Sequence, residues 1–322
     1  MSKALISENS LAESATELTP KRKVSILGVP LGYGASMAGV DMGPSALRVA
    51  RLHQRIAQLG YEVTDLGDIR LGRPQSPPET NETLKYLSEI SDACEQVATE
   101  VQTILTAEQF PLIIGGDHSI AIGSVAGVAS YYREQKQGLG LIWFDAHADM
   151  NTPETTPSGN IHGMPLAALL GYGAPELTNI GGFTPKLDPR SCAHVGARDI
   201  DCGERVLIRK LGIRFFTMRE IDERGMAACM DEAIEIASSA TAGYSVTFDV
   251  DALDPGDAPG SGTLVRGGLT YREAHLAMEK IAEAGGIRSL EVVEINTALD
   301  VNNKTAELGV ELILSALGKT IL

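Results

Sequence analysis

Cysteines and basic residues are both scarce in this sequence of 322 residues. The four cysteines, Cys94, Cys192, Cys202 and Cys229, are scattered, with neither a metal-binding spacing nor the dense disulfide framework of small secreted proteins. Lysine and arginine total 27 against 42 acidic residues, which gives a net charge of -15. This excess of acid argues against nucleic-acid binding and would attract a cationic substrate. Reduced thiols and a cytoplasmic location are the simplest expectation.

Long apolar runs are also missing. No stretch is apolar enough to span a bilayer, so we expect no membrane segment. Residues 1–23 lack the apolar region of a signal peptide and contain several Ser, Thr and Glu, which predicts a flexible N-terminal tail. The glycine-rich stretch after the first predicted strand (residues 24–28) has no GxGxxG spacing, so it gives little support to a dinucleotide site.

The most informative stretch present is LGLIWFDAHAD, residues 139–149. Its apolar run, residues 141–144, predicts a buried strand, and Asp145, His147 and Asp149 follow at every second position. Alternate side chains of an extended chain share a face, so two carboxylates and an imidazole would converge beyond the strand. A divalent cation would relieve the repulsion between buried carboxylates. The stretch therefore predicts a metal site; a solvated, helix-capping loop is the alternative.

Two more apolar strands lead into residues of the same kind. The strand at residues 111–114 precedes His118, and the strand at residues 244–248 precedes Asp249 and Asp251, again at every second position. In open α/β sheets ligands bind beyond the carboxyl ends of the strands, where all these side chains fall. We therefore expect one pocket to collect them.

Helical segments separate most of about eight predicted strands. This order favours an α/β fold with a mainly parallel sheet and helices on both faces, in a single domain that spans residues 24–322. Residues 44–59 and residues 221–238 are each predicted as one continuous helix.

Together the strand ends supply two imidazoles and four carboxylates: His118, Asp145, His147, Asp149, Asp249 and Asp251. Six ligands are too many for one tetrahedral zinc ion, and a carboxylate-rich set suits two manganese ions. Two such ions can share carboxylates and activate a bridging water near neutral pH, which predicts a hydrolase. A phosphate ester is disfavoured as the substrate, because no basic loop accompanies the acids.

Seven motifs resemble those of the manganese-dependent ureohydrolases, most closely the arginases. In chain order they are GVDMGPSALR (39–48), GGDHS (115–119), DAHAD (145–149), SGNIHGMP (158–165), RDIDCGE (198–204), SVTFDVDALDP (245–255) and VVEIN (292–296). They extend from the first predicted strand to the last. The resemblance implies an eight-stranded, mainly parallel sheet, two Mn²⁺ ions per subunit and a homotrimer or homohexamer.

The resemblance also implies roles for individual residues. One ion would be held by His118, Asp145, Asp149 and Asp249, and the other by Asp145, His147, Asp249 and Asp251. A hydroxide bridging the ions would attack the guanidinium carbon of L-arginine, giving L-ornithine and urea. Asp149 and His162 would deliver a proton to the leaving amine, and Glu294 would pair with the guanidinium as a bidentate acceptor.

Substrate choice in this family depends on the end of the substrate away from the guanidinium, which in arginine carries the α-carboxylate and the α-ammonium. Agmatine lacks the α-carboxylate that arginine carries. Asn151, Ser158 and Asn160 resemble arginase contacts to that carboxylate, made directly or through water. Asp201 and Glu204 lie where the α-ammonium would bind. These residues imply arginine rather than agmatine.

Other positions leave alternatives open. Thr263 matches a further pocket residue of the family, and Asp199 is either an acid behind the site or a helix cap. The sequence departs from the family at Cys202 and Thr297, where proline is usual, and at the loop 34–38, which is usually more polar or basic. Another ureohydrolase, such as an agmatinase or guanidinobutyrase, is one alternative, and a non-catalytic metal-bound scaffold is a second. A deacetylase of similar architecture is more remote, because this site has too many carboxylates.

Overall fold

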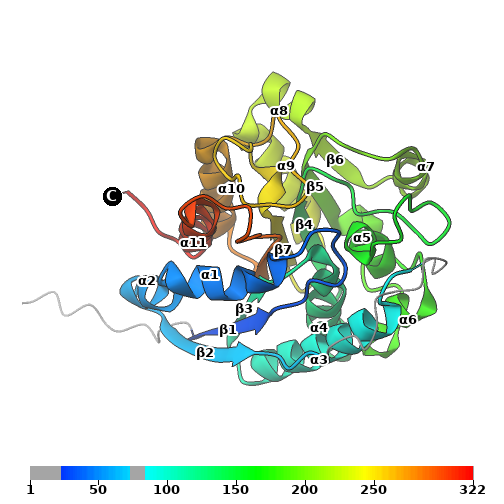
Figure 1. Ribbon diagram of the computed structural model, residues 1–322, viewed down its shortest axis with the longest axis horizontal. Helices are drawn as coiled ribbons and strands as arrows, with labels where there is room; N and C mark the ends of the chain where they lie inside the picture. The colour runs from blue at the N-terminus through cyan, green and yellow to red at the C-terminus, as the bar shows by residue number, and fades with distance from the viewer. Residues whose placement is uncertain (1–22, 73–83, 322) are drawn as a thin grey trace, which may run out of the picture.

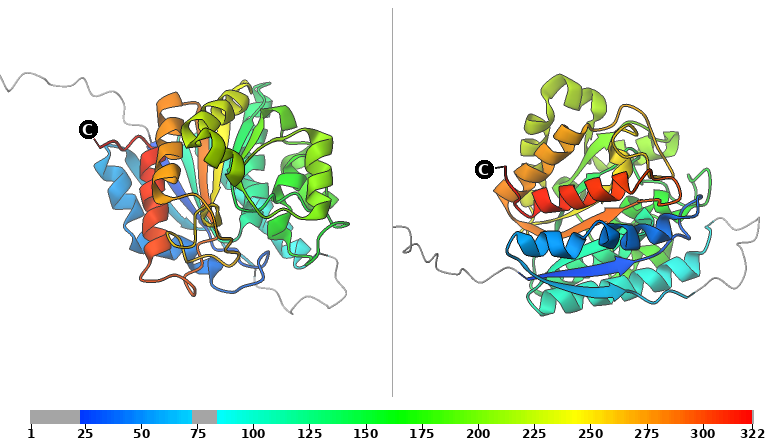
Figure 2. Two further views of the ribbon diagram at one scale, coloured as in Figure 1. Left: turned by 90° about the horizontal axis from the view of Figure 1, so that it is seen from above. Right: turned by 60° about the vertical axis from the view of Figure 1, so that its left-hand side comes forward.

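The computed structural model describes residues 23–72 and 84–321, which form an eight-stranded sheet between two layers of helices (Figures 1 and 2). The strands are β1 (Lys23–Val29), β2 (Glu62–Asp68), β3 (Phe110–Gly115), β4 (Gly140–Phe144), β5 (Cys192–Ala197), β6 (Arg214–Thr217), β7 (Tyr244–Asp249) and β8 (Ile287–Val293). Their order is β2-β1-β3-β8-β7-β4-β5-β6, and every neighbouring pair is parallel. The predicted α/β class is confirmed. The tail predicted for residues 1–23 lies outside the described residues apart from Lys23, which begins β1.

Burial explains which strands are central. Every residue of β4, β5 and β7 is buried, as expected for parallel strands covered on both faces. The edge strand β2 instead alternates between exposed and half-buried residues. The apolar sequences of the central strands therefore fix where their carboxyl ends lie.

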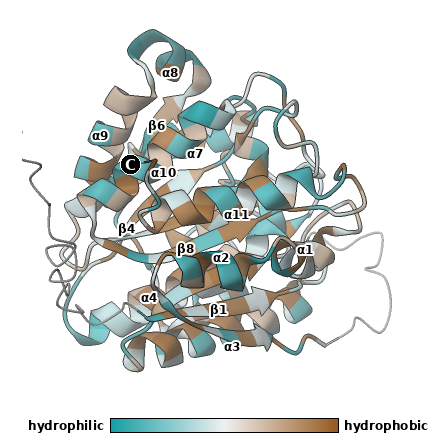
Figure 3. Ribbon diagram, turned by 90° about the vertical axis from the view of Figure 1, so that its left-hand side faces the viewer, coloured by the Kyte–Doolittle hydropathy of each residue, from teal (hydrophilic) through white to brown (hydrophobic). Residues whose placement is uncertain are grey.

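The helices divide between the two faces of the sheet. One face is covered by α1 (Gly43–Val49), α2 (Leu52–Gln58), α8 (Met218–Arg224), α9 (Met226–Ser238), α10 (Tyr271–Ala284) and α11 (Lys304–Ala316). The other is covered by α3 (Leu87–Thr106), α4 (Ala121–Glu134), α5 (Pro165–Leu169), α6 (Pro175–Thr178) and α7 (Cys202–Leu211). Figure 3 shows hydrophilic and hydrophobic residues along α11, whose apolar residues are buried. Among the described residues, no helix is both long enough and apolar enough to cross a membrane.

Two predicted helices are each divided in two. The helix predicted at residues 44–59 is interrupted at Arg51, whose φ is 63°. The helix predicted at residues 221–238 is interrupted at Gly225, whose φ is 82°. Apolar residues on both sides of each break face the same core, so the sequence pattern continues across it.

A close backbone contact holds the loop that leads from β3 into the site. A Cβ atom on Gly116 would lie 1.9 Å from the carbonyl oxygen of Leu31, so only glycine fits there. The amide of the next residue, Asp117, donates to the same carbonyl oxygen at 2.8 Å. The chain after β1 and the chain after β3 are thus fixed against each other immediately before His118.

Candidate active site

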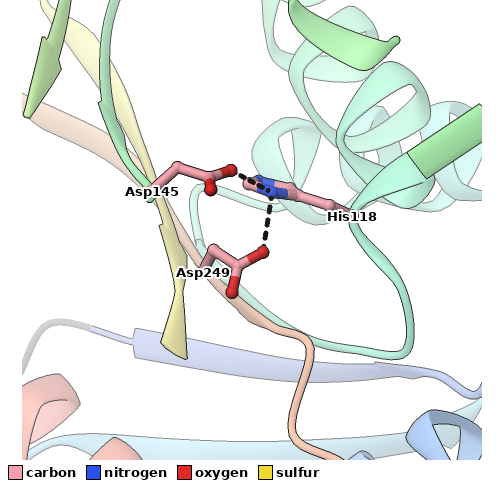
Figure 4. A group of neighbouring side chains, drawn as sticks. All are labelled: His118, Asp145 and Asp249. Atoms are coloured by element: carbon pink, nitrogen blue, oxygen red, sulfur yellow. Dashed lines mark ion pairs between the residues drawn. The ribbon is translucent and has the colours of Figure 1, made fainter. Parts of the chain in front are cut away.

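Four adjacent strands in the middle of the sheet, β3, β8, β7 and β4, carry the predicted chemistry at their carboxyl ends. His118 begins a short 3-10 turn after β3, Asp145 follows β4 directly, and Asp249 is the last residue of β7. Figure 4 shows these three side chains pointing toward one another. Strands that are far apart in the sequence therefore bring an imidazole and two carboxylates together.

The His118 ring presents its Nδ1 atom to three carboxylates. Nδ1 lies 3.1 Å from Asp145, 3.2 Å from Asp149 and 3.3 Å from Asp249, but it forms no hydrogen bond. Asp149 Oδ2 is likewise buried without a hydrogen-bond partner. Buried ligand-type atoms that converge without pairing are the arrangement that a cation would satisfy.

A hydrogen-bond chain on the far side of the ring fixes the tautomer of His118. The hydroxyl of Thr247 donates to Glu291 Oε1 at 2.8 Å, so its oxygen accepts from His118 Nε2, which lies 2.9 Å away. The proton on Nε2 leaves a lone pair on Nδ1 that faces the carboxylates. The geometry thus suits Nδ1 as a metal ligand.

A second group of ligand atoms lies next to the first. His147 Nδ1 lies 3.1 Å from Asp251 and 3.4 Å from Asp145. In the described part of the chain, the ligand atoms of His118, Asp145 and Asp249 lie within 4.8 Å of one another, and so do those of Asp145, His147 and Asp251. Asp145 belongs to both groups, as expected of a bridging ligand. Asp249, which was also predicted to bind both ions, belongs only to the first group. Asp149 belongs to neither, although its Oδ2 atom lies 3.2 Å from His118 Nδ1.

Burial and mutual repulsion make most of these acids reluctant to ionise. Burial, followed by repulsion from Asp145, raises the pKa of Asp149 to about 7. Burial, followed by repulsion from Asp251 and Asp145, raises the pKa of Asp249 well above its usual value. Asp145 is the exception: burial would raise its pKa, but His118 and His147, when their rings are protonated in the absence of metal, outweigh burial and lower it well below its usual value. A bound cation would remove the penalty on the other two.

His162 and Glu294 form a pair beside this centre. Glu294 Oε1 accepts the backbone N–H of His118 at 2.9 Å and lies 3.0 Å from His162 Nδ1. Burial disfavours the charged imidazole, but Glu294 outweighs it, which raises the pKa of His162 to about 9. The structure thus brings together the two residues predicted to move a proton and to bind a guanidinium.

Asp117 is a neighbour of this pair that the sequence did not single out. It is fully buried, accepts the Gly34 amide at 2.8 Å and raises the pKa of His162. Burial, followed by repulsion from Glu294, raises its own pKa to about 6. Its place in the GGDHS motif, directly before His118, was the available signal.

A cavity of about 290 Å³ opens onto the centre. Six of the residues predicted to contact substrate line it, namely Asn151, Ser158, Asn160, Asp201, Glu204 and Thr263, whereas the buried Glu294, predicted to pair with the guanidinium, is not among its lining residues. Asp199 lines it too, as do four residues that were not predicted: Ser36, Thr156, Pro157 and Gly163. Gly163 belongs to the SGNIHGMP motif and ends a 3-10 turn, whereas Ser36, Thr156 and Pro157 lie in irregular segments where no local pattern marks a site.

Hydrogen bonds hold the polar side chains of the cavity wall in place. Asn151 donates to Asp201 at 3.0 Å, and Thr263 donates to Asp251 at 2.8 Å. Glu204 accepts the amides of Met150 and Asp201, at 2.9 Å and 2.8 Å, and so ties the start of α7 to the chain after β4. The wall is therefore built from residues that also fix one another.

Comparisons with known proteins agree with this geometry. The family model described as "Arginase family" matches residues 22–318. An arginase of Bacillus caldovelox is 49% identical over 302 residues, which are 94% of this chain and 100% of that protein. The crystal structure of arginase from Bacillus cereus matches with a TM-score of 0.87 at 48% identity, over 94% of this chain and 100% of that one. The structure of Entamoeba histolytica arginase in complex with L-ornithine matches with a TM-score of 0.85 at 29% identity, over 93% and 99%.

Proposed function

The chain belongs to the arginase family, and we propose that it hydrolyses L-arginine to L-ornithine and urea. One observation supports this most strongly: a single cavity has the paired His and Asp groups at one end and Asn151, Ser158 and Asn160 in its wall. The His and Asp groups could activate water through bound metal, and the three wall residues could hold a carboxylate. Relatives named arginase match over nearly the whole chain.

We propose two Mn²⁺ ions per subunit. The unpaired Nδ1 of His118 and Oδ2 of Asp149 fit this, as does the carboxylate majority among the ligands. One ion would take His118, Asp145, Asp149 and Asp249, and the other would take Asp145, His147, Asp249 and Asp251. Bound there, the ions would lower the pKa of a water molecule toward neutrality.

The protein's own groups would then orient the guanidinium and move protons. Glu294 uses Oε1 for His118 and His162, which leaves Oε2 to accept a guanidinium N–H. Asp149, beside the bound water, could pass on a proton from it. His162, whose pKa is raised to about 9, would carry a proton to the leaving amine.

The remaining polar residues of the cavity would recognise the α-carbon end. Asn151, Ser158 and Asn160 offer N–H or O–H donors to the α-carboxylate, while Asp201 and Glu204 offer acceptors to the α-ammonium. Thr263 would hold Asp251 in position through its hydrogen bond. Family likeness further supports a cytoplasmic homotrimer or homohexamer, which belongs to this same proposal.

Urea release tests the proposal. Protein purified without metal and then loaded with Mn²⁺ should release urea from L-arginine, and agmatine should react about a hundredfold more slowly or worse, because the carboxylate donors would be left unpaired. The metal-free protein, assayed in parallel, should release none. Release from agmatine alone would favour an agmatinase, and release from neither would favour another guanidino substrate or a non-catalytic role.

A further inference from the structure

Among the residues that the structure describes, the wall of this acid-lined cavity contains no lysine or arginine. Five of its lining residues are acids: Asp149, Asp199, Asp201, Glu204 and Asp249. Asp149 and Asp249 would face the proposed ions, whereas Asp199, Asp201 and Glu204 would place like charges near a substrate carboxylate. A positive charge close behind the wall would offset that repulsion.

Lys85 supplies such a charge. Its Nζ atom lies 2.9 Å from Asn160 Oδ1, and its backbone N–H donates to the carbonyl of Gly159 at 3.0 Å. Lys85 is half-buried and forms no ion pair with a carboxylate in the described part of the chain. Its charge is therefore not cancelled locally, and only one side chain separates it from the cavity.

The lysine also sets the direction of a hydrogen-bond chain. Lysine can only donate, so the amide oxygen of Asn160 must face Lys85. The Asn160 amide nitrogen then faces Ser36 and donates to its Oγ. Because Ser36 Oγ already accepts from Asn160, its hydroxyl hydrogen is left to donate into the cavity, which both Ser36 and Asn160 line. The chain from Lys85 to Ser36 thus presents donors to an anion.

We propose that Lys85, acting through Asn160 and Ser36, selects guanidino substrates that carry an α-carboxylate. This inference rests on the proposed arginine hydrolysis and assigns its substrate preference to a residue outside the cavity wall. Lys85 is a positioning residue in this scheme. Its effect falls on binding of the carboxylate end and leaves the reacting guanidinium end unchanged.

The test compares ligands that differ only in the carboxylate. Lys85→Met removes the charge and keeps the length of the side chain, Lys85→Arg restores the charge, and Lys136→Met is the matched control. Lys136 is exposed and precedes the amino end of β4, whereas the cavity lies at the carboxyl ends of the strands. The full-length, Mn²⁺-loaded proteins are assayed for kcat and KM with L-arginine and for competitive inhibition by L-ornithine and putrescine.

For Lys85→Met we expect KM for L-arginine and Ki for L-ornithine to rise about tenfold, the size of one lost interaction with a charged group. Ki for putrescine and kcat should stay within about twofold, because neither involves the carboxylate. Lys85→Arg should recover part of the ornithine affinity. Ser36→Ala should show a smaller change in the same direction, and it provides the test if Lys85→Met does not fold.

If Lys85→Met weakens the binding of ornithine and of putrescine equally, the inference is overturned, because Lys85 would then only hold the loop at Gly159 and Asn160. Unchanged affinity for both would overturn it too. If the wild-type enzyme hydrolyses arginine but Lys85→Met leaves the ratio of Ki for ornithine to Ki for putrescine unchanged, this inference is refuted and the proposed function is not. A wild-type enzyme that acts on agmatine alone refutes the proposed function, and this inference falls with it.

Discussion

Asp149 and Glu294 both hold a backbone conformation that residues other than glycine rarely adopt. Their φ angles are 53° and 63°. Such a conformation costs on the order of 1–3 kcal/mol per residue and persists only where the surrounding structure enforces it. Glycine would relieve the strain at either position but would remove a carboxylate from the site. The strain thus falls on two residues whose side chains the proposed chemistry requires.

Replacing Asp249 with Asn should weaken manganese binding without destabilising the metal-free protein. Burial, with Asp251 and Asp145, raises the pKa of Asp249 well above its usual value, so its charged form is unfavourable until a cation arrives. Asparagine keeps an oxygen for the Asp251 amide, which Asp249 accepts at 2.8 Å. We expect Mn²⁺ affinity to fall about a hundredfold or more, measured by equilibrium dialysis, and the metal-free melting temperature to stay equal or rise.

The control for this variant is Asp222→Asn, an exposed acid of α8. It should bind Mn²⁺ as the wild-type protein does. If Asp249→Asn also binds normally, Asp249 is not a ligand and the bridging role assigned to it is wrong.

At the scale of elements, the buried strands could be predicted from the sequence. The apolar runs at residues 111–114, 141–144 and 244–248 fall within β3, β4 and β7, because strands buried on both faces need continuous apolar sequence. The helix break at Arg51 could not be predicted, because the apolar spacing continues across it and arginine is an ordinary helix residue. For the break at Gly225 the glycine itself was the local signal, since glycine readily adopts a positive φ.

The candidate site could be predicted where its residues follow one strand. Asp145 and His147 share a face by simple alternation, and so do Asp249 and Asp251. Contacts between distant segments left no such pattern. Lys85 meets Asn160 across 75 residues of chain, and Asn160 meets Ser36 across 124. Only the fold brings those loops together, which is why the carboxylate-recognition chain emerged from the structure.

The outer edge of the sheet is held largely by charge. Arg214 of β6 donates to Glu220 of α8 at 2.8 Å and to Glu232 of α9 at 2.7 Å. Its guanidinium also lies over the ring of Phe216, 3.9 Å from the ring centre. Since β6 is otherwise mostly half-buried, this cluster joins the edge strand to the two helices.

Replacing Glu220 with Gln should therefore lower the free energy of unfolding by about 1–2 kcal/mol at pH 7, after allowance for solvent screening. The bond from Arg214, assisted by Arg224, lowers the pKa of Glu220 from 4.5 to about 2. A lowered carboxyl pKa stabilises the fold fully above pH 4.5, and that contribution is lost as the pH falls toward 2. Urea unfolding of both proteins at pH 7 and pH 4 should show the smaller difference at pH 4.

Glu223→Gln is the matched control, because Glu223 pairs with Arg219 on the exposed side of the same helix. It should change stability by at most about 0.5 kcal/mol. A Glu220→Gln variant that is as stable as this control at pH 7 would show that the edge of the sheet does not depend on the Arg214 cluster.

At the scale of the whole molecule, the metal centre should couple to global stability. Buried acids that repel one another lie at the ends of β4 and β7, next to His118 after β3, so a cation that binds there binds only the folded chain. At a free Mn²⁺ concentration of about a hundred times the dissociation constant, each site adds about 2.7 kcal/mol to the free energy of unfolding. For a chain of this size, two sites should raise the melting temperature by roughly 5–10 °C.

The fluorescence of a buried tryptophan beside the metal centre can report Mn²⁺ binding. The protein's single tryptophan, Trp143, is buried in β4 and stacks on the His118 ring with centroids 4.2 Å apart. Titration of metal-free protein with MnCl₂ should change Trp143 emission in step with the rise in melting temperature. Asp249→Asn should abolish both changes at the same Mn²⁺ concentration, whereas Asp222→Asn should retain them. A change in emission without stabilisation would mean that Mn²⁺ also binds the unfolded chain. Stabilisation without a change in emission would place the manganese site away from His118, and the absence of both changes would mean that Mn²⁺ does not bind.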